Sequence, residues 1–213
     1  AMIGAPLAVS LMDYFSSPTS NGVMMTMATM GVIYFCFMLF GVVTARIPVQ
    51  DWKPKGWNPA KVKVDKMISL NHVSADNAIK SPQFWQLWGI LFLNVTAGIG
   101  VLSVASPMIQ NVLNVSLYVA GGFVGLLSLF NLLGRFFWSS FSDKIGRKSV
   151  YMIYLGLGAV VYFLIPEIAS LGNLLFFVLG WGLIYSMYGG GFSTIPAYLK
   201  DLFGTYQVGA IHG

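Results

Sequence analysis

The stretch LYVAGGFVGLLSLFNLLGRFFWSS, residues 117–140, decides how this chain folds. It is long enough to cross a lipid bilayer as a helix, since a spanning helix needs about 20 mostly apolar residues. It also carries an arginine, Arg135, well inside the apolar run. An arginine at the centre of a membrane helix costs about 2.5 to 3.5 kcal/mol on insertion scales, so it is rarely kept there without a function.

Arg135 shares one side of the predicted helix with other polar residues. Spacings of three and four residues place side chains on one face of a helix, and this face carries Ser128, Asn131, Arg135, Ser139 and Ser142. A polar stripe around a buried cation indicates a water-filled path that accepts an anion. The planar fork of arginine bonds both oxygens of a carboxylate, so a small carboxylate is the predicted partner. The competing interpretation is an arginine that snorkels to the cytoplasmic surface or pairs with backbone carbonyls.

The whole chain has the composition of a membrane protein. Of its 213 residues, 56% are hydrophobic and 9% are charged, whereas soluble domains carry roughly 25% charged residues. Five apolar stretches approach or exceed the length of a spanning helix, at 23–45, 86–110, 117–139, 150–166 and 174–199. The predicted fold class is therefore all-α, a polytopic membrane helix bundle.

Basic residues set the predicted orientation. Lys and Arg gather in alternate connections, which the positive-inside rule places in the cytoplasm: 46–85, 140–149 and 200–207. The net charge of +5 is thus a topology signal and does not indicate nucleic-acid binding. The lipid bilayer is the expected partner, and the predicted location is the plasma (inner) membrane, crossed several times.

The same pattern divides the chain into three parts. Residues 1–45 are expected to be the last two helices of an N-terminal bundle, the first of them truncated, and 46–85 a cytoplasmic central loop. Residues 86–213 are expected to form a C-terminal bundle of four helices and the start of a fifth. Within the loop, 60–80 is predicted either as a short surface helix or as a solvated linker. The chain lacks an initiator methionine and ends in an apolar run, so we expect a fragment that is inactive alone.

Several site chemistries are not expected. Cys36 is the only cysteine, and His72 and His212 have no neighbouring metal-ligand pattern, so no metal or cofactor is predicted. An enzyme would need a nucleophile, an acid–base pair or a metal, and none is evident. No Asp or Glu lies deep in a spanning stretch, which favours anion exchange or uniport over proton coupling.

Residues 139–148 read Ser-Ser-Phe-Ser-Asp-Lys-Ile-Gly-Arg-Lys and join two predicted spans on the cytoplasmic side. They resemble the loop signature of the major facilitator superfamily, Gly-x-x-x-Asp-Arg/Lys-x-Gly-Arg-Arg/Lys. Asp143, Lys144, Gly146, Arg147 and Lys148 match, while Ser139 replaces the first glycine. Gly146 permits a turn with positive φ, and Asp143 can pair with Arg147. Such a cluster can lock and release the cytoplasmic side; the alternative is that it only holds topology.

Further motifs resemble one branch, the oxalate/formate antiporter family. They are 81–88 at a helix start, 131–138 around Arg135, and 201–205. The resemblance implies helix five to the start of helix eleven of a transporter that works by alternating access, a monomer when full length. It also implies that Arg135, in the eighth helix, engages the substrate carboxylate. The family's second cavity cation, a lysine of helix eleven, would lie past Gly213.

Other residues are candidates for the substrate cavity. Asn131 lies one turn before Arg135 and can orient it or donate to substrate. Trp181, Tyr185 and Tyr188 share a helix face by spacing, and plain packing is the alternative. Asn94 is either a cavity residue or an interhelical hydrogen bond. The leading hypothesis is exchange of small mono- or dicarboxylates. The alternatives are a major facilitator carrier of another solute, such as a drug exporter, and a carboxylate sensor that does not transport.

Overall fold

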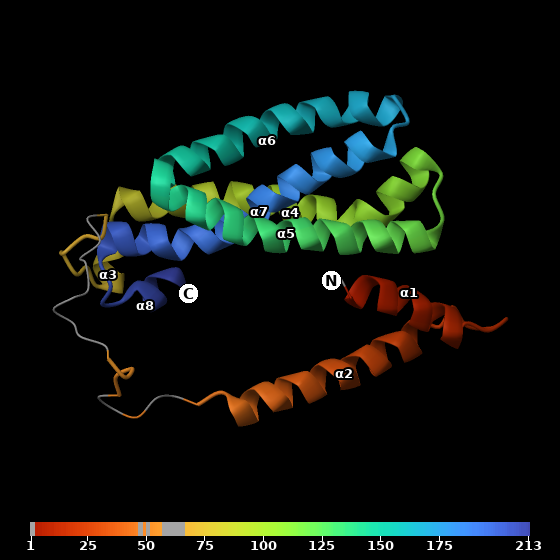
Figure 1. The fold of residues 1–213 in the computed structure, drawn as a ribbon, viewed down its shortest axis with the longest axis horizontal. Coiled ribbons are helices and arrows are strands. Elements are labelled where there is room, and N and C mark those ends of the chain that lie inside the picture. The colour runs from red at the N-terminus through yellow and green to blue at the C-terminus, as the bar shows by residue number, and fades with distance from the viewer. Residues whose placement is uncertain (1–2, 47–48, 50–51, 57–66) are drawn as a thin grey trace. The chain divides into compact units, whose positions relative to one another are not determined.

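The computed structural model describes residues 3–46, 49, 52–56 and 67–213, and in these residues the regular secondary structure is helical apart from one bridge between Ser17 and Ser20. The predicted all-α class is confirmed. Figure 1 shows the helices in chain order. They are α1 (Gly4–Phe15), α2 (Val23–Thr44), α3 (Ala75–Ala78), α4 (Pro82–Leu113), α5 (Leu117–Ile145), α6 (Arg147–Ser170), α7 (Leu174–Phe203) and α8 (Val208–His212).

Five of these helices are long and apolar enough to cross a membrane: α2, α4, α5, α6 and α7. Each contains nearly all of one of the five apolar stretches identified in the sequence, so the predicted spans are confirmed. The short α8 begins where the sequence predicted a further helix. A chain with five such helices is an integral, multi-pass membrane protein.

Side-chain caps fix where three of the spanning helices begin. Ser81 precedes α4, Ser116 precedes α5 and Asn173 precedes α7, and each accepts a hydrogen bond from a backbone N–H in the first turn. These caps satisfy donors that have no partner within the helix. Gly146 ends α5 with φ of 90°, the positive value predicted for this glycine.

The chain separates into two compact units. One comprises residues 7–65, with most of α1 and all of α2; the other comprises 1–6 and 66–213, with α3 to α8. The division into an N-terminal bundle, a central loop and a C-terminal bundle remains a prediction. The larger unit carries Arg135 and the loop motif.

For 60–80 the sequence left a short surface helix and a solvated linker as alternatives, and the structure describes residues 67–80 of this segment. Residues 57–66 lie outside the described part of the chain, and of 67–80 only α3 is α-helical. The backbone N–H groups of Ser69 and Val73 donate instead to the carbonyls of Asp201 and Phe203, at 3.0 Å each. Because these donors bond to the end of α7, they are not available for a local helix.

The helix α7 lies at the centre of the larger unit and contacts α4, α5, α6 and α8 (Figure 1). Its glycine run lets three helices approach at one level. A Cβ on Gly189 would overlap Asn131 of α5, one on Gly190 would overlap Tyr154 of α6 and Trp138 of α5, and one on Gly191 would overlap Asn94 of α4. Small residues allow such close contact between membrane helices. The helix runs unbroken from Leu174 to Phe203, so the run serves packing at this level.

Candidate functional site

Arg135 lies where α5 and α7 approach most closely. The glycine before it, Gly134, packs against the backbone of Ser186, and Asn131 packs against Gly189. Both contacts would be blocked by a side chain on the glycine. The turn of α5 that precedes Arg135 is therefore packed directly against α7.

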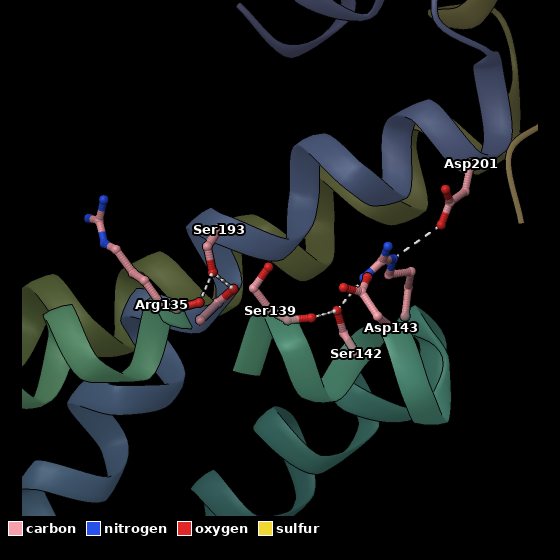
Figure 2. A network of polar contacts seen from close by, with 8 residues as sticks. Arg135, Ser139, Ser142, Asp143, Ser193 and Asp201 are labelled. Carbon is pink, nitrogen blue, oxygen red and sulfur yellow. Dashed lines mark hydrogen bonds and ion pairs between the residues drawn. The ribbon is translucent and has the colours of Figure 1, made fainter. Parts of the chain in front are cut away.

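Two polar contacts hold Arg135 itself. Its Nε donates to Oδ1 of Asn131 over 3.3 Å, and its carbonyl accepts from the hydroxyl of Ser193 over 3.1 Å. Figure 2 shows the guanidinium pointing away from Ser193 and α7. The side chain is exposed on this unit, and it forms no ion pair with any carboxylate that the structure describes. Its two terminal NH₂ groups have no hydrogen-bond partner among the described residues. Sequence reasoning missed Ser193, whose only signal was its place one turn after Gly189.

The polar stripe of α5 divides into two parts. Asn131 and Arg135 lie on the open side, whereas Ser142 is fully buried, donates to the carbonyl of Ser139 and accepts from Arg147. Ser128 bonds only the carbonyl of Val124 one turn back. The Ser142 end of the stripe is thus part of the loop cluster, the contacts of Ser142, Asp143 and Asp201 with Arg147.

That loop cluster is organised by Arg147, which is only 8% exposed. Its guanidinium contacts Asp143 and Ser142 and, from the end of α7, Asp201, with 3.1 Å between Nε and Oδ2. Figure 2 shows the side chains of Ser142, Asp143 and Asp201 converging there. The predicted pair of Asp143 and Arg147 is present. Lys144 and Lys148, in contrast, are exposed.

Asp201 is the partner that sequence reasoning missed. Its side chain is 11% exposed, against 59% for Asp143, so the pair with Arg147 is the more buried one. The segment 69–75 also forms hydrogen bonds with the end of α7 and the residues that follow it. Ser69 donates to the Asp201 carbonyl, and the N–H of Ala75 donates to Oε1 of Gln207 over 2.7 Å. Arg147 therefore links the α5–α6 turn to the last turn of α7, whose end also accepts hydrogen bonds from the segment 69–75.

The aromatic stripe of α7 packs against α4 and α6. The Tyr185 hydroxyl donates to the Gly98 carbonyl over 3.1 Å, the Tyr188 ring covers Gly98, and Trp181 stands edge-on to Tyr162. Trp181 and Tyr185 are buried, and Tyr188 is half-buried. The shared face is as the spacing indicated, while a role in lining the substrate cavity stays a prediction.

Asn94 is buried between α4 and α7, where its Nδ2 donates to the Met187 carbonyl over 3.4 Å. This is the interhelical bond that the sequence offered as an alternative, and contact with substrate stays a prediction. Among the described residues, no three His, Cys, Asp or Glu side chains gather as they would around a metal ion.

Comparison with known families decides the assignment. The model of the Major Facilitator Superfamily matches residues 1–213. The chain belongs to this superfamily. Major Facilitator Superfamily proteins are transporters rather than enzymes, in agreement with the sequence-based exclusion of an enzyme. The family recognised from the loop signature is thus confirmed.

Three curated proteins are similar to this chain. The oxalate:formate antiporter of Oxalobacter formigenes is 37% identical over 65% of this chain and 33% of its own length. The apicoplast pyruvate carrier 1 of Toxoplasma gondii is 29% identical over 66% of the chain and 26% of its own. The uncharacterized MFS-type transporter YhjX of Escherichia coli (strain K12) is 24% identical over 90% and 45%. The chain spans less than half of each relative, and no solved structure matches it.

Proposed function

We propose that the complete protein is a secondary transporter that moves small carboxylates by alternating access. The observation that carries the proposal is Arg135, a cation inside a spanning helix, held at its Nε and carbonyl and without a described carboxylate partner. Because an unpaired charge in a membrane is costly, a bound anion is the natural counter-ion. Two relatives whose names state a substrate, the oxalate:formate antiporter and the pyruvate carrier, are named for small carboxylates.

The hydrogen bond to Asn131 suggests how the anion binds. With Nε engaged, the two terminal NH₂ groups of Arg135 present a fork of parallel donors that matches the two oxygens of one carboxylate. Asn131 would then be a positioning residue. A second cation would suit the second carboxylate of a dicarboxylate. Tyr185, Tyr188, Trp181 and Asn94 remain candidates for further substrate contacts.

The loop cluster is proposed to switch the cytoplasmic side between states. Arg147 of α6 pairs with Asp143 of α5 and with Asp201 of α7. A state that moves α7 away from the α5–α6 turn must therefore break the pair with Asp201. The proposed switch loop also includes Ser139, Lys144, Gly146 and Lys148. Such a pair stabilises one state and leaves the other accessible once it opens.

Exchange is the proposed mode of transport. In the described parts of the spanning helices, the carboxylates Asp143, Glu167 and Asp201 lie at the helix ends. Proton relays in transporters use carboxylates or histidines within the membrane. The proposed setting is a monomer in the plasma membrane, with 46–85, 140–149 and 200–207 in the cytoplasm and no nucleic-acid partner.

The test uses the full-length protein in liposomes. Liposomes are loaded with unlabelled oxalate, formate or pyruvate, or with a neutral sugar, and uptake of the labelled carboxylates is followed. We expect uptake only when a carboxylate is inside, because exchange needs a counter-substrate. Uptake of none of the carboxylates by a folded protein would contradict the substrate class and favour another solute or a sensor.

A further inference from the structure

The segment 69–75, which precedes α3 and α4 in the chain, lies along the end of α7 and the start of α8. We call this segment the strap. Its backbone N–H groups donate to that region: Ser69 to the carbonyl of Asp201 and Val73 to that of Phe203, over 3.0 Å each, and Ala75 to Oε1 of Gln207, over 2.7 Å. Figure 1 shows α3 and α8 together beside the end of α7. The strap therefore binds the last turn of α7 and the connection that follows it.

The α7–α8 connection fits under the strap at Gly204. This glycine has φ of 78° and ψ of −175°, a conformation that is essentially restricted to glycine. A Cβ on Gly204 would lie 2.7 Å from the carbonyl oxygen of Asn71 and 2.8 Å from Nδ1 of His72. The absence of a side chain thus permits both the turn and the close approach of the strap.

The other end of the strap is fixed to the start of α4. Ala78, the last residue of α3, is fully buried in the core. Its carbonyl accepts from the hydroxyl of Ser81 over 2.6 Å, and the carbonyl of Ile79 accepts from Nε1 of Trp85 over 2.8 Å. Because Trp85 belongs to the first turn of α4, the strap connects the start of α4 to the end of α7.

Asp201 takes part in both the strap contact and the loop cluster. Its backbone carbonyl accepts from the N–H of Ser69, and its carboxylate lies 3.1 Å from Nε of Arg147. Both groups belong to one residue in the last turn of α7. A displacement of this turn that breaks one contact therefore moves the acceptor of the other.

We propose that the strap is a conformational device, which holds the last turn of α7 where Asp201 meets Arg147 and is released when that ion pair opens. The inference rests on the proposed role of the loop cluster as a switch. Coupling between two contacts is reciprocal. Breaking the ion pair is therefore expected to loosen the strap, and loosening the strap is expected to loosen the ion pair. The segment before α4 thereby influences the state of the switch.

Hydrogen exchange tests the first direction, in full-length protein in lipid nanodiscs without substrate. Asp201→Asn removes the charge that pairs with Arg147 and keeps the backbone carbonyl that accepts from Ser69. We expect the strap amides to exchange several-fold faster in this variant. Asp143→Asn is the matched control, because it removes another carboxylate partner of Arg147 without altering α7. Strap exchange in Asp143→Asn is expected to stay at the wild-type rate.

Ala75→Pro tests the reverse direction. Ala75 is the first residue of α3, and Ser74 before it has φ of −71° and ψ of 155°, angles that suit a residue before proline. The substitution therefore removes the N–H that donates to Gln207 with little change in the backbone. One hydrogen bond changes an opening equilibrium by about two- to tenfold. We expect exchange of the Gly146 and Val150 amides, in the α5–α6 turn, to rise by up to this factor.

A second proline variant and an internal reference serve as controls. Leu117→Pro places proline first in α5, after Ser116 with φ of −68° and ψ of 160°, and is expected to leave the α5–α6 turn unchanged. The amides of 171–172 bond to carbonyls at the end of α6 and report any general loss of stability.

The proposal predicts faster exchange in the strap for Asp201→Asn and in the α5–α6 turn for Ala75→Pro, with 171–172 unchanged in both. Wild-type rates in either place, or changes that only parallel those of 171–172, would overturn it. Absence of carboxylate transport by the wild type would instead contradict the proposed function, and it would not alter these exchange rates.

Discussion

Arg147→Leu is expected to destabilise the protein by about 3–5 kcal/mol, because it leaves Asp201 buried without its cation. Asp201 is 11% exposed, and Arg147 is its ion-pair partner across the 54 positions that separate them. The variant also strips Ser142 and Asp143 of their contacts with the guanidinium. The measurement is the thermal unfolding midpoint of the full-length protein in detergent.

Two further variants distinguish the effect of losing the buried ion pair from the effect of losing a positive charge alone. Lys148→Leu removes the exposed charge next in the chain and is expected to change stability by less than about 0.5 kcal/mol. The double variant Arg147→Leu with Asp201→Leu is expected to regain most of the lost stability, since replacing both partners removes the unpaired charge. An Arg147→Leu variant as stable as the wild type would show that the cluster does not hold the adjoining ends of α5, α6 and α7 together.

Gly189→Ala is expected to destabilise the larger unit by about 1–3 kcal/mol through overpacking. The new Cβ would overlap the backbone oxygen of Asn131, and backbone cannot swing aside as a flexible side chain does. The separation of α5 and α7 would have to increase at the turn that carries Arg135. The measurement is the unfolding midpoint of the full-length protein, together with its rate of carboxylate exchange.

Gly156→Ala is the matched control for this substitution. Gly156 lies within α6 with nothing within 4 Å of the added Cβ, so alanine there is expected to stabilise by about 0.5–1 kcal/mol through its better helix propensity. The two substitutions are chemically identical and are expected to have opposite signs. If both substitutions changed the free energy of unfolding equally, close packing at Gly189 would not explain the effect of Gly189→Ala.

Most of the architecture could be predicted because it follows from local sequence. The apolar length of each span and the turn at Gly146 are encoded within a few neighbouring residues, and the structure has them at those places. The pair of Asp143 and Arg147 was also predictable, since the two residues flank the turn at Gly146 within one loop motif.

The rest depends on contacts between helices far apart in sequence. Nothing near Arg147 indicates that its buried partner is Asp201, and nothing near Arg135 indicates that Ser193 bonds its carbonyl. The helical spacing of Trp181, Tyr185 and Tyr188 correctly put them on one face but left open what that face meets. The choice between a surface helix and a linker at 60–80 also depends on distant contacts, because carbonyls at the end of α7 accept hydrogen bonds from the backbone N–H groups of Ser69 and Val73.

The central claim is that Arg135 binds the transported carboxylate, and the most direct measurement is oxalate exchange by full-length wild type and Arg135→Gln in liposomes. Losing one partner of a desolvated charge pair costs about 2–5 kcal/mol, so we expect exchange at low substrate concentration to fall by about 100-fold. The unfolding midpoint is expected to stay near that of the wild type, because the Arg135 side chain is exposed and donates one described side-chain hydrogen bond. Undiminished exchange in Arg135→Gln would contradict the account.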